Sequence, residues 1–293
     1  MATEQEKALR ERAGQLLSSG KVELVIGYGK TYLGDGVRPR FVKTESDAQW
    51  LVWNNRCVHN LATYLSKEPV LSVVGNGGRV GIVAKGCDAR GIVALVQEKQ
   101  LRRSAVHVIG MVCNGVVDDG AASGAAFKCT ACEVQVPPVY DDLIGNESDV
   151  MPIEGEPAED IDRIRSLDRS QRWAFWTREL SRCIKCYACR QACPLCYCGE
   201  CITEKSRPQW IDKSSSLRGN IAYHFIRATH LAGRCVACGE CARACPMNIP
   251  VDLLSRFLSQ RVEEVYDYRA GIDPEAEPFY VTNREDDPED FIR

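Results

Sequence analysis

The chain has 293 residues, of which 45% are hydrophobic, so it is long enough for two domains with buried cores. Its formal net charge of −3 excludes the strongly basic surface that gathers nucleic acid or an anionic membrane. Because the sequence shows no secretion signal and no apolar run of about 18–20 residues, we expect a cytoplasmic protein without a membrane span. In that compartment its 16 cysteines indicate metal ligation and not disulfides.

The first half of the chain predicts an α/β domain with a small, mainly parallel sheet. A polar helix is expected over residues 2–19, and the loop GYGKTYLGDG is interpreted as a turn, with phosphate binding as the alternative. The apolar patterns predict helices over 51–65 and 86–101 and strands over 21–28, 79–84 and 105–113. The last strand–helix–strand unit places Cys87 and Cys113 near the carboxyl ends of neighbouring strands, where open α/β sheets hold cofactors.

Two acidic, proline-containing stretches without an apolar period divide the rest of the chain and are interpreted as a linker and a solvated tail. The predicted segments are an N-terminal helix at 1–20, the α/β domain at 21–145, the acidic linker at 146–172, a cysteine-rich domain at 173–268 and the acidic tail at 269–293.

The strongest signal is a repeated run in which four cysteines with spacings of two, two and three residues are followed by proline. In such runs three thiolates bind one 4Fe-4S cluster and the fourth reaches the other cluster of a pair. We therefore expect one cluster on Cys183, Cys186, Cys189 and Cys245, and a second on Cys193, Cys235, Cys238 and Cys241. Structural zinc is the alternative, but it is far less specific to this spacing.

The two runs are separated by about forty residues, which predicts an elaborated α+β bacterial-type dicluster ferredoxin domain. Within this insertion, IAYHFIRATHL predicts an amphipathic helix. Three further cysteines exceed what two clusters need: Cys196, Cys198 and Cys201. They could bind zinc or another cluster, or they could be buried thiols that donate S–H bonds to cluster sulfides.

A third cysteine set in the first half of the chain indicates a third 4Fe-4S cluster on Cys87, Cys113, Cys129 and Cys132. The alternative is that these are buried small hydrophobic residues, and Cys57 competes as a ligand. The four histidines are interpreted as packing residues, so no catalytic residue is predicted. The aromatic group Trp173, Phe175 and Trp176 is expected to pack over the first cluster.

The stretches RVGIVAKGCDARGIVALVQEKQL, VIGMVC and CTAC resemble the β-subunit family of coenzyme F-420-reducing hydrogenases and formate dehydrogenases. The resemblance covers roughly residues 20–145, with the ferredoxin module following it. It implies a 4Fe-4S cluster on the cysteines corresponding to Cys87, Cys113, Cys129 and Cys132, beside an FAD in the first domain. The sequence departs from that family at WNNRCVHNLATYL, where bulky residues replace a glycine-rich turn.

These patterns together predict an iron-sulfur electron-transfer subunit of a cytoplasmic multi-subunit oxidoreductase of anaerobic metabolism, linked to a hydrogenase, formate dehydrogenase or heterodisulfide-reductase-like module. Its clusters would relay single electrons between sites that cannot touch, so the chain needs no acid-base or nucleophilic residues. The alternative is a flavin-containing oxidoreductase that acts on a deazaflavin or nicotinamide coenzyme. Hetero-oligomeric partners are expected, and nucleic acid is not.

Overall fold

The computed structural model describes residues 2–32, 34–117, 124–130, 132–153 and 159–280. The chain divides into two compact units, which we describe separately. Unit 1 comprises Met1–Pro157 with Gly271–Pro274, and unit 2 comprises Ala158–Ala270 with Glu275–Arg293. The narrower segment boundaries expected from the sequence stay predictions.

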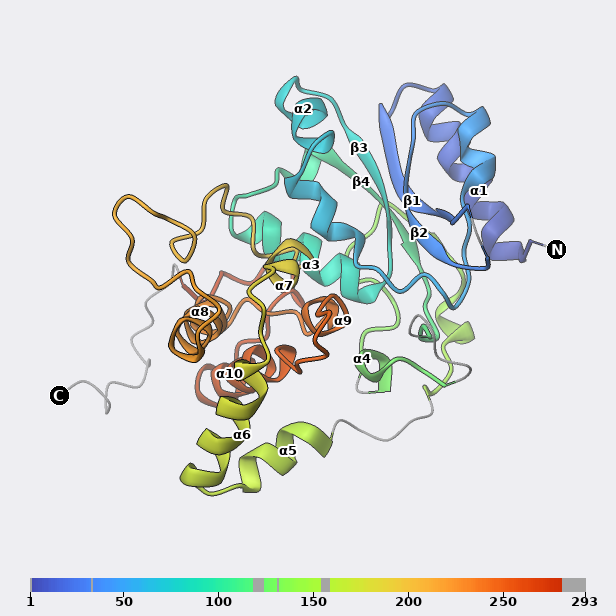
Figure 1. Cartoon of the computed structure of the whole chain (residues 1–293). Coiled ribbons are helices and arrows are strands. Elements are labelled where there is room, and N and C mark those ends of the chain that lie inside the picture. The colour runs from blue at the N-terminus through green and yellow to red at the C-terminus, as the bar shows by residue number, and fades with distance from the viewer. Residues whose placement is uncertain (1, 33, 118–123, 131, 154–158, 281–293) are drawn as a thin grey trace. The chain divides into compact units, whose positions relative to one another are not determined.

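Unit 1 is built on a mixed five-stranded sheet in the order β2-β1-β3-β4-β5 (Figure 1). The strands are β1 (Leu24–Lys30), β2 (Val37–Val42), β3 (Val80–Ala84), β4 (Val106–Met111) and β5 (Asp142–Ile144). β1 and β2 are antiparallel, and the other three neighbouring pairs are parallel. Every residue of β3 and β4 is buried, as expected for β-branched runs inside a parallel sheet. The predicted α/β class with a mainly parallel sheet is therefore confirmed.

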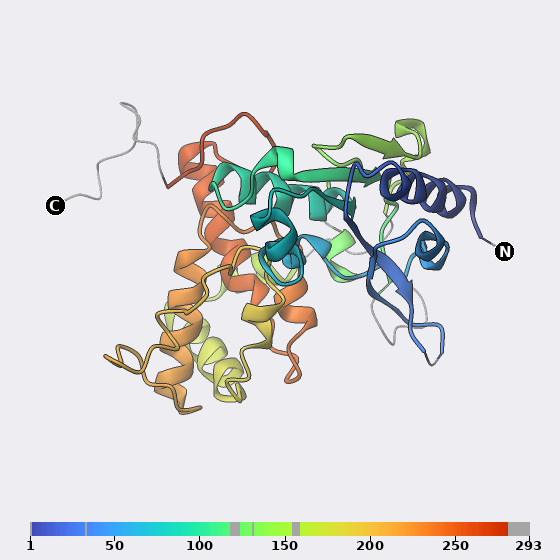
Figure 2. The same cartoon turned by 90° about the horizontal axis from the view of Figure 1, so that it is seen from above.

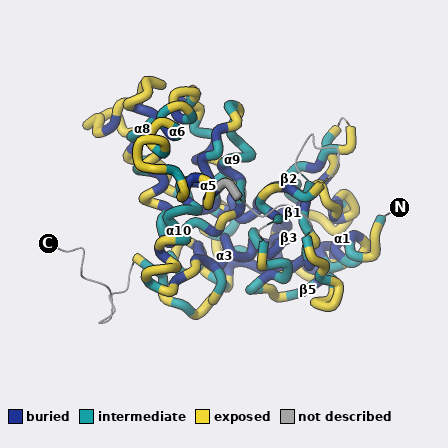
Figure 3. The backbone as a smooth tube through the Cα atoms, turned by 90° about the horizontal axis from the view of Figure 1, so that it is seen from below, coloured by how far each residue is buried: buried dark blue, intermediate teal, exposed yellow. Residues whose placement is uncertain are grey.

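Helices flank this sheet, and α1 begins at a capping residue. They are α1 (Glu4–Ser18), α2 (Val70–Gly75), α3 (Gly86–Gln97) and α4 (Phe127–Thr130), with 3-10 helices at Ser46–Trp50, Leu61–Ser66, Arg103–Ala105 and Glu147–Asp149. α1 starts at Thr3, whose side chain accepts a hydrogen bond from the Glu6 amide. α1 is tied to the sheet because Arg12 donates to Asp142 at 2.7 Å. Most of α3 is buried (Figure 3).

One helix predicted for unit 1 is wrong. Residues 51–65 do not form one helix, since only Leu61–Ser66 is helical. Asparagine side chains compete with helical backbone bonds there: Asn54 accepts from the Arg56 amide at 2.8 Å and Asn60 from the Ala62 amide at 3.0 Å. The turn expected in GYGKTYLGDG is present, since the Thr31 amide donates to the Gly36 carbonyl at 2.9 Å, but β1 extends further than expected, to Lys30, and β2 was not predicted.

The described part of unit 2 contains helices and turns but no strand. Its helices are α5 (Glu159–Ser166), α6 (Arg169–Ser181), α7 (Ala188–Gln191), α8 (Leu217–His230), α9 (Glu240–Arg243) and α10 (Asp252–Tyr266). α8 contacts both α6 and α10, as Figure 2 shows. The strands of the expected α+β ferredoxin domain are thus not seen between residues 159 and 280.

Two further differences concern unit 2. The predicted linker contains α5, whose Ile161 and Ile164 lie one turn apart and are buried in the core. The tail expected from residue 269 is partly packed, because Phe279 stacks on Tyr268 at 5.9 Å between ring centroids. Residues 281–293 of that tail lie outside the described part of the chain.

Candidate iron-sulfur centres

The two cysteine runs of unit 2 share left-handed residues at equivalent positions. In the first run Lys185 and Tyr187 have positive φ angles of 56° and 59°, and in the second run Ala237 and Gly239 occupy the equivalent positions with 55° and 70°. Such left-handed residues reverse the chain sharply. Each run then enters a one-turn helix, α7 or α9, and these two helices contact each other. The sequence repeat is therefore also a structural repeat.

One set of thiols combines cysteines of both runs. Cys183, Cys189 and Cys245 pack in the same hydrophobic core, with Trp176 and Tyr223. Burial raises the pKa of the Cys183 thiol, and the charges of Cys189, Cys245 and Cys186 raise it further, so these three cysteines lie within electrostatic reach of Cys183. These are the four residues that the sequence assigns to one cluster, although the ligand assignment itself stays a prediction.

Hydrogen-bonding groups surround the sulfurs of this set. The Tyr223 hydroxyl lies 3.3 Å from Cys189 Sγ, and Nε2 of His224 lies 3.3 Å from Cys183 Sγ. Burial lowers the pKa of His224 to about 4, so its ring is neutral at pH 7. The backbone amides of Lys185 and Ile249 donate to Cys183 and Cys245 at 3.3 and 3.5 Å. Such donors stabilise thiolate and cluster sulfur.

A second set of thiols lines one cavity: Cys193, Cys235, Cys238 and Cys241, together with Arg227, Asp252 and Ser255. Burial raises the pKa of the Cys238 and Cys241 thiols well above the usual range. Four soft sulfur ligands around one cavity are the donor set that a 4Fe-4S cluster requires. This set again mixes the two runs, since Cys193 belongs to the first.

The three additional cysteines lie in different surroundings. A hydrogen bond with Cys196 lowers the pKa of Cys193, so these two thiols touch. Cys198 is exposed, and Cys201 accepts a hydrogen bond from the Thr203 hydroxyl at 3.2 Å. Within the described residues, no three His, Cys, Asp or Glu side chains are close enough together to hold a single metal ion. The structure therefore shows Cys196 beside a predicted ligand and no compact site for Cys198 and Cys201.

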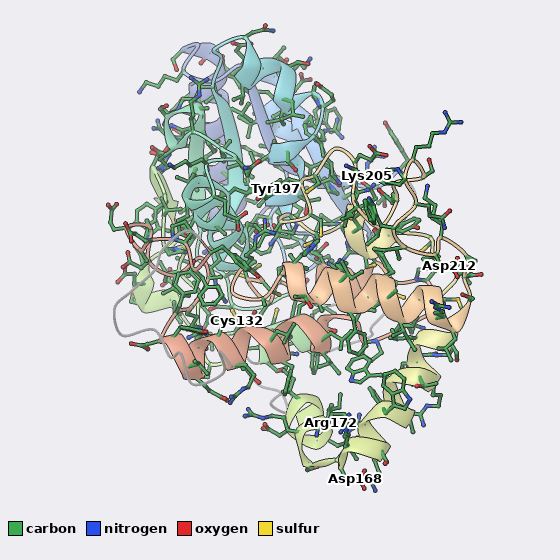
Figure 4. The ribbon with its side chains drawn as sticks, turned by 90° about the vertical axis from the view of Figure 1, so that its left-hand side faces the viewer. Cys132, Asp168, Arg172, Tyr197, Lys205 and Asp212 are labelled. Atoms are coloured by element: carbon green, nitrogen blue, oxygen red, sulfur yellow. The ribbon has the colours of Figure 1, made fainter. Side chains whose placement is uncertain are left out.

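The loop before α8 is fixed by a lysine that the sequence reading did not single out. Lys185 Nζ donates to the backbone oxygens of Asp212 and Ser214 at 2.5 and 2.8 Å. The Asp212 carboxylate accepts from Ser214 and Ser216, and Figure 4 shows Asp212 at one end of α8. The first cysteine run and the start of α8 are thereby joined.

In unit 1, four cysteines gather near the carboxyl ends of β3 and β4. Cys87 lies in the first turn of α3, Cys113 follows β4, Cys129 lies in α4, and Cys132 follows it. Burial raises the pKa of Cys113 to about 11, and the charges of Cys129 and Cys132 contribute. Burial also raises the pKa of Cys57 to about 12. Since Cys57 is within electrostatic reach of Cys113, it remains a competing ligand.

A buried charge pair that sequence reasoning missed lies beside this set. Lys85 Nζ is 2.8 Å from a carboxylate oxygen of Asp88, and the two side chains are 1% and 0% exposed. Lys85 also donates to the Tyr28 hydroxyl and to the His59 carbonyl oxygen. Burial alone would lower the pKa of Lys85, but the charge and hydrogen bond of Asp88, together with Tyr28 and Cys87, outweigh it and hold the pKa well above its usual range. The only sequence signal was an acidic residue in the first turn of α3.

The backbone at the start of α3 is equally constrained. A Cβ added at Gly86 would lie 1.7 Å from the carbonyl oxygen of Val134, so only glycine fits there. Val134 follows Cys132 closely in the chain, and Gly86 precedes Cys87. This close approach therefore holds the segments of two predicted ligands together.

Comparison with known proteins identifies one domain. A family model described as a 4Fe-4S dicluster domain matches residues 179–249, which include both cysteine runs. No helix among the described residues has the length and apolar character required to cross a membrane.

Two curated relatives are similar to part of the chain. The F420-dependent formate dehydrogenase subunit beta of Methanocaldococcus jannaschii is 34% identical over 110 residues, which are 37% of this chain and 28% of that protein. The F420-dependent formate dehydrogenase 1 subunit beta of Methanococcus maripaludis is 38% identical over 103 residues, 35% of this chain and 26% of that protein. The chain thus spans about a quarter of the length of these relatives. It carries a 4Fe-4S dicluster domain and is similar, over about a third of its length, to beta subunits of F420-dependent formate dehydrogenases.

Proposed function

We propose that the chain is an iron-sulfur electron-transfer subunit of a multi-subunit oxidoreductase and relays single electrons through several 4Fe-4S clusters. The observation that carries this proposal is the exchange of cysteines between the two runs of unit 2. Cys245 of the second run packs with Cys183 and Cys189 of the first, and Cys193 of the first lines the cavity of the second. This exchange is expected of a cluster pair, because each run supplies three ligands to one cluster and one to the other.

Each cluster, when bound, supplies a one-electron carrier that needs little rearrangement. The residues of the chain bury most of the ligand sulfurs partly or fully, and backbone amides donate to Cys183 and Cys245. Cys183, Cys186, Cys189 and Cys245 would hold the first cluster, and Cys193, Cys235, Cys238 and Cys241 the second. The core of unit 2, with Trp176 buried beside the first set, keeps water out. Trp173, by contrast, is 56% exposed, so it does not pack over the first cluster as the sequence led us to expect of all three aromatic residues.

A third cluster in unit 1 is supported by burial and by mutual proximity. Cys87, Cys113, Cys129 and Cys132 would hold it at the carboxyl edge of the sheet, and Cys57 is the substitute ligand. Two parallel strands end at this edge, and open α/β sheets bind cofactors there. A third carrier in a separate unit would let the chain connect two redox partners.

The partners are proposed as other subunits of a cytoplasmic complex of the hydrogenase, formate dehydrogenase or heterodisulfide-reductase-like class. The named relatives are beta subunits, which by that name work beside at least one other subunit. A second candidate function is a flavin-containing oxidoreductase that exchanges electrons with a deazaflavin coenzyme in unit 1. The names of the relatives favour it, because both are called F420-dependent.

The cluster exchange is testable with single ligand variants of the full chain, purified without oxygen. In Cys245→Ala the cluster of the first run should be lost or altered, and the spectrum of the second should remain. Cys193→Ala should give the reverse pattern, and the exposed Cys198→Ala should leave both spectra unchanged. Electron paramagnetic resonance of the reduced protein separates the two clusters. If Cys245→Ala instead removes only the second cluster, each run holds its own cluster and the proposed exchange is wrong.

A further inference from the structure

A buried arginine of α8 lies between the two cysteine sets of unit 2. Arg227 is 7% exposed, and its Nη2 donates to the backbone oxygen of Cys189 at 3.1 Å. The same side chain lines the cavity of Cys193, Cys235, Cys238 and Cys241. Cys189 is a predicted ligand of the first cluster, and the cavity belongs to the second. Arg227 therefore touches both predicted centres.

No carboxylate of the described residues forms an ion pair with Arg227, since Asp252 of the same cavity pairs with Arg256. The buried Nε of Arg227 has no hydrogen-bond partner there either. Burying an unpaired cation is costly, so a counter-charge is expected nearby. The soft ligands beside it are the thiols that line the same cavity: Cys193, Cys235, Cys238 and Cys241. A cluster held by these thiols would supply the negative charge that Arg227 faces.

Asp252 lines the same cavity, but its carboxylate is paired with Arg256. Its carboxylate lies 3.5 Å from Arg256, one helical turn further along α10. The cavity thus has one cation and one anion on its wall, contributed by two different helices. The two charges should shift the reduction potential of any redox group in the cavity in opposite directions.

We propose that Arg227 is a positioning residue whose fixed positive charge raises the reduction potentials of both clusters, and that of the Cys193, Cys235, Cys238 and Cys241 cluster most. Reduction adds one electron to a cluster without making or breaking a bond, so the reduced state is more negative by one charge. A buried cation stabilises that state more than the oxidised one, and the low dielectric of the interior strengthens the effect. This inference rests on the proposed electron relay, because it assigns the control of its potentials.

The position of Arg227 on α8 supports this role. Tyr223 lies four residues earlier on the same helix face, with its hydroxyl 3.3 Å from Cys189 Sγ. α8 therefore presents a neutral donor and a cation, one turn apart, to neighbouring predicted ligands. This helix belongs to the long insertion between the two cysteine runs, so the insertion would supply the means of setting the potentials.

The test is a redox titration of the full chain, purified without oxygen and followed by electron paramagnetic resonance. Arg227→Gln removes the charge and keeps a polar side chain, and Arg227→Lys keeps the charge. At a fixed applied potential, we expect Arg227→Gln to lower the ratio of reduced to oxidised second cluster about tenfold, which is about 59 mV for a one-electron couple. The shift of the first cluster should have the same sign and be smaller, and Arg227→Lys should recover most of both shifts.

Two further variants separate charge from structure. Arg218→Gln makes the same substitution at an exposed position of α8 and should not shift either potential. Asp252→Asn removes the opposite charge and should raise the potential of the second cluster. Unchanged potentials in an Arg227→Gln protein with full iron content would overturn the proposal, as would equal shifts in Arg227→Gln and Arg227→Lys. If Arg227→Gln loses iron, Asp252→Asn decides instead, and an unchanged or lowered potential of the second cluster would overturn the proposal. A wild-type protein without clusters would instead refute the proposed relay.

Discussion

Replacing Lys85 by methionine should loosen unit 1 next to its predicted cluster. The variant leaves the Asp88 carboxylate buried without its cation, and breaking a buried pair by removing one partner costs about 3–5 kcal/mol. Asp88 keeps two backbone donors, the amides of Lys85 and Leu61. We therefore expect the lower end, about 3 kcal/mol, which corresponds to roughly 100-fold faster opening of the local structure.

Hydrogen exchange followed by mass spectrometry measures this opening directly, because it resolves the amides of α3 and β3 from those of unit 2. Lys30→Met, at an exposed position, is the matched control and should leave exchange unchanged. The double variant Lys85→Met/Asp88→Asn should exchange more slowly than Lys85→Met, because removing the uncompensated charge outweighs the loss of one of the two backbone bonds that Asp88 accepts. Unchanged exchange in Lys85→Met, or faster exchange in the double variant, would refute the reasoning.

Three further changes follow from packing and charge. Gly86→Ala should destabilise unit 1 by about 1–3 kcal/mol through overpacking, whereas Gly75→Ala, whose Cβ meets nothing within 4 Å, should be neutral in the same urea titration. Trp176→Ala, at 7% exposure, should cost unit 2 about 3–5 kcal/mol, and Trp173→Ala, at 56%, far less; equal losses in thermal unfolding would contradict this. Burial raises the pKa of Asp142, but its hydrogen bonds from an arginine and a histidine outweigh this and hold it below the usual value. Asp142→Asn should thus be less stable than wild type above pH about 4, with the difference vanishing as pH falls through the folded pKa.

The parts of the fold that the sequence predicted are those with strong local signals. β3, α3 and β4 are continuous apolar runs, and their burial in a parallel sheet follows from that composition. β2 was missed because VRPRFV carries two arginines and Pro39, which suit only an edge strand. The helix expected over 51–65 does not form as one helix, because asparagine side chains in this segment accept hydrogen bonds from nearby backbone amides.

The candidate site likewise has features that the sequence predicted and features that it did not. The cysteine spacing alone led to the two interleaved thiol sets, because a cluster-binding run encodes its own geometry. The burial of Lys85 and Arg227 could not be predicted, since the cost of burying a charge is offset only by tertiary partners distant in sequence. Sequence patterns normally place lysine and arginine at the surface.

The most direct test of the proposed relay is the content of iron, acid-labile sulfide, zinc and flavin per chain in protein purified without oxygen. Three 4Fe-4S clusters predict about twelve irons and about twelve sulfides, with no zinc. About eight irons would mean that unit 1 binds no cluster. About twelve irons with one flavin would favour the flavin-containing oxidoreductase. A colourless protein with zinc and no iron would contradict the electron-transfer function altogether.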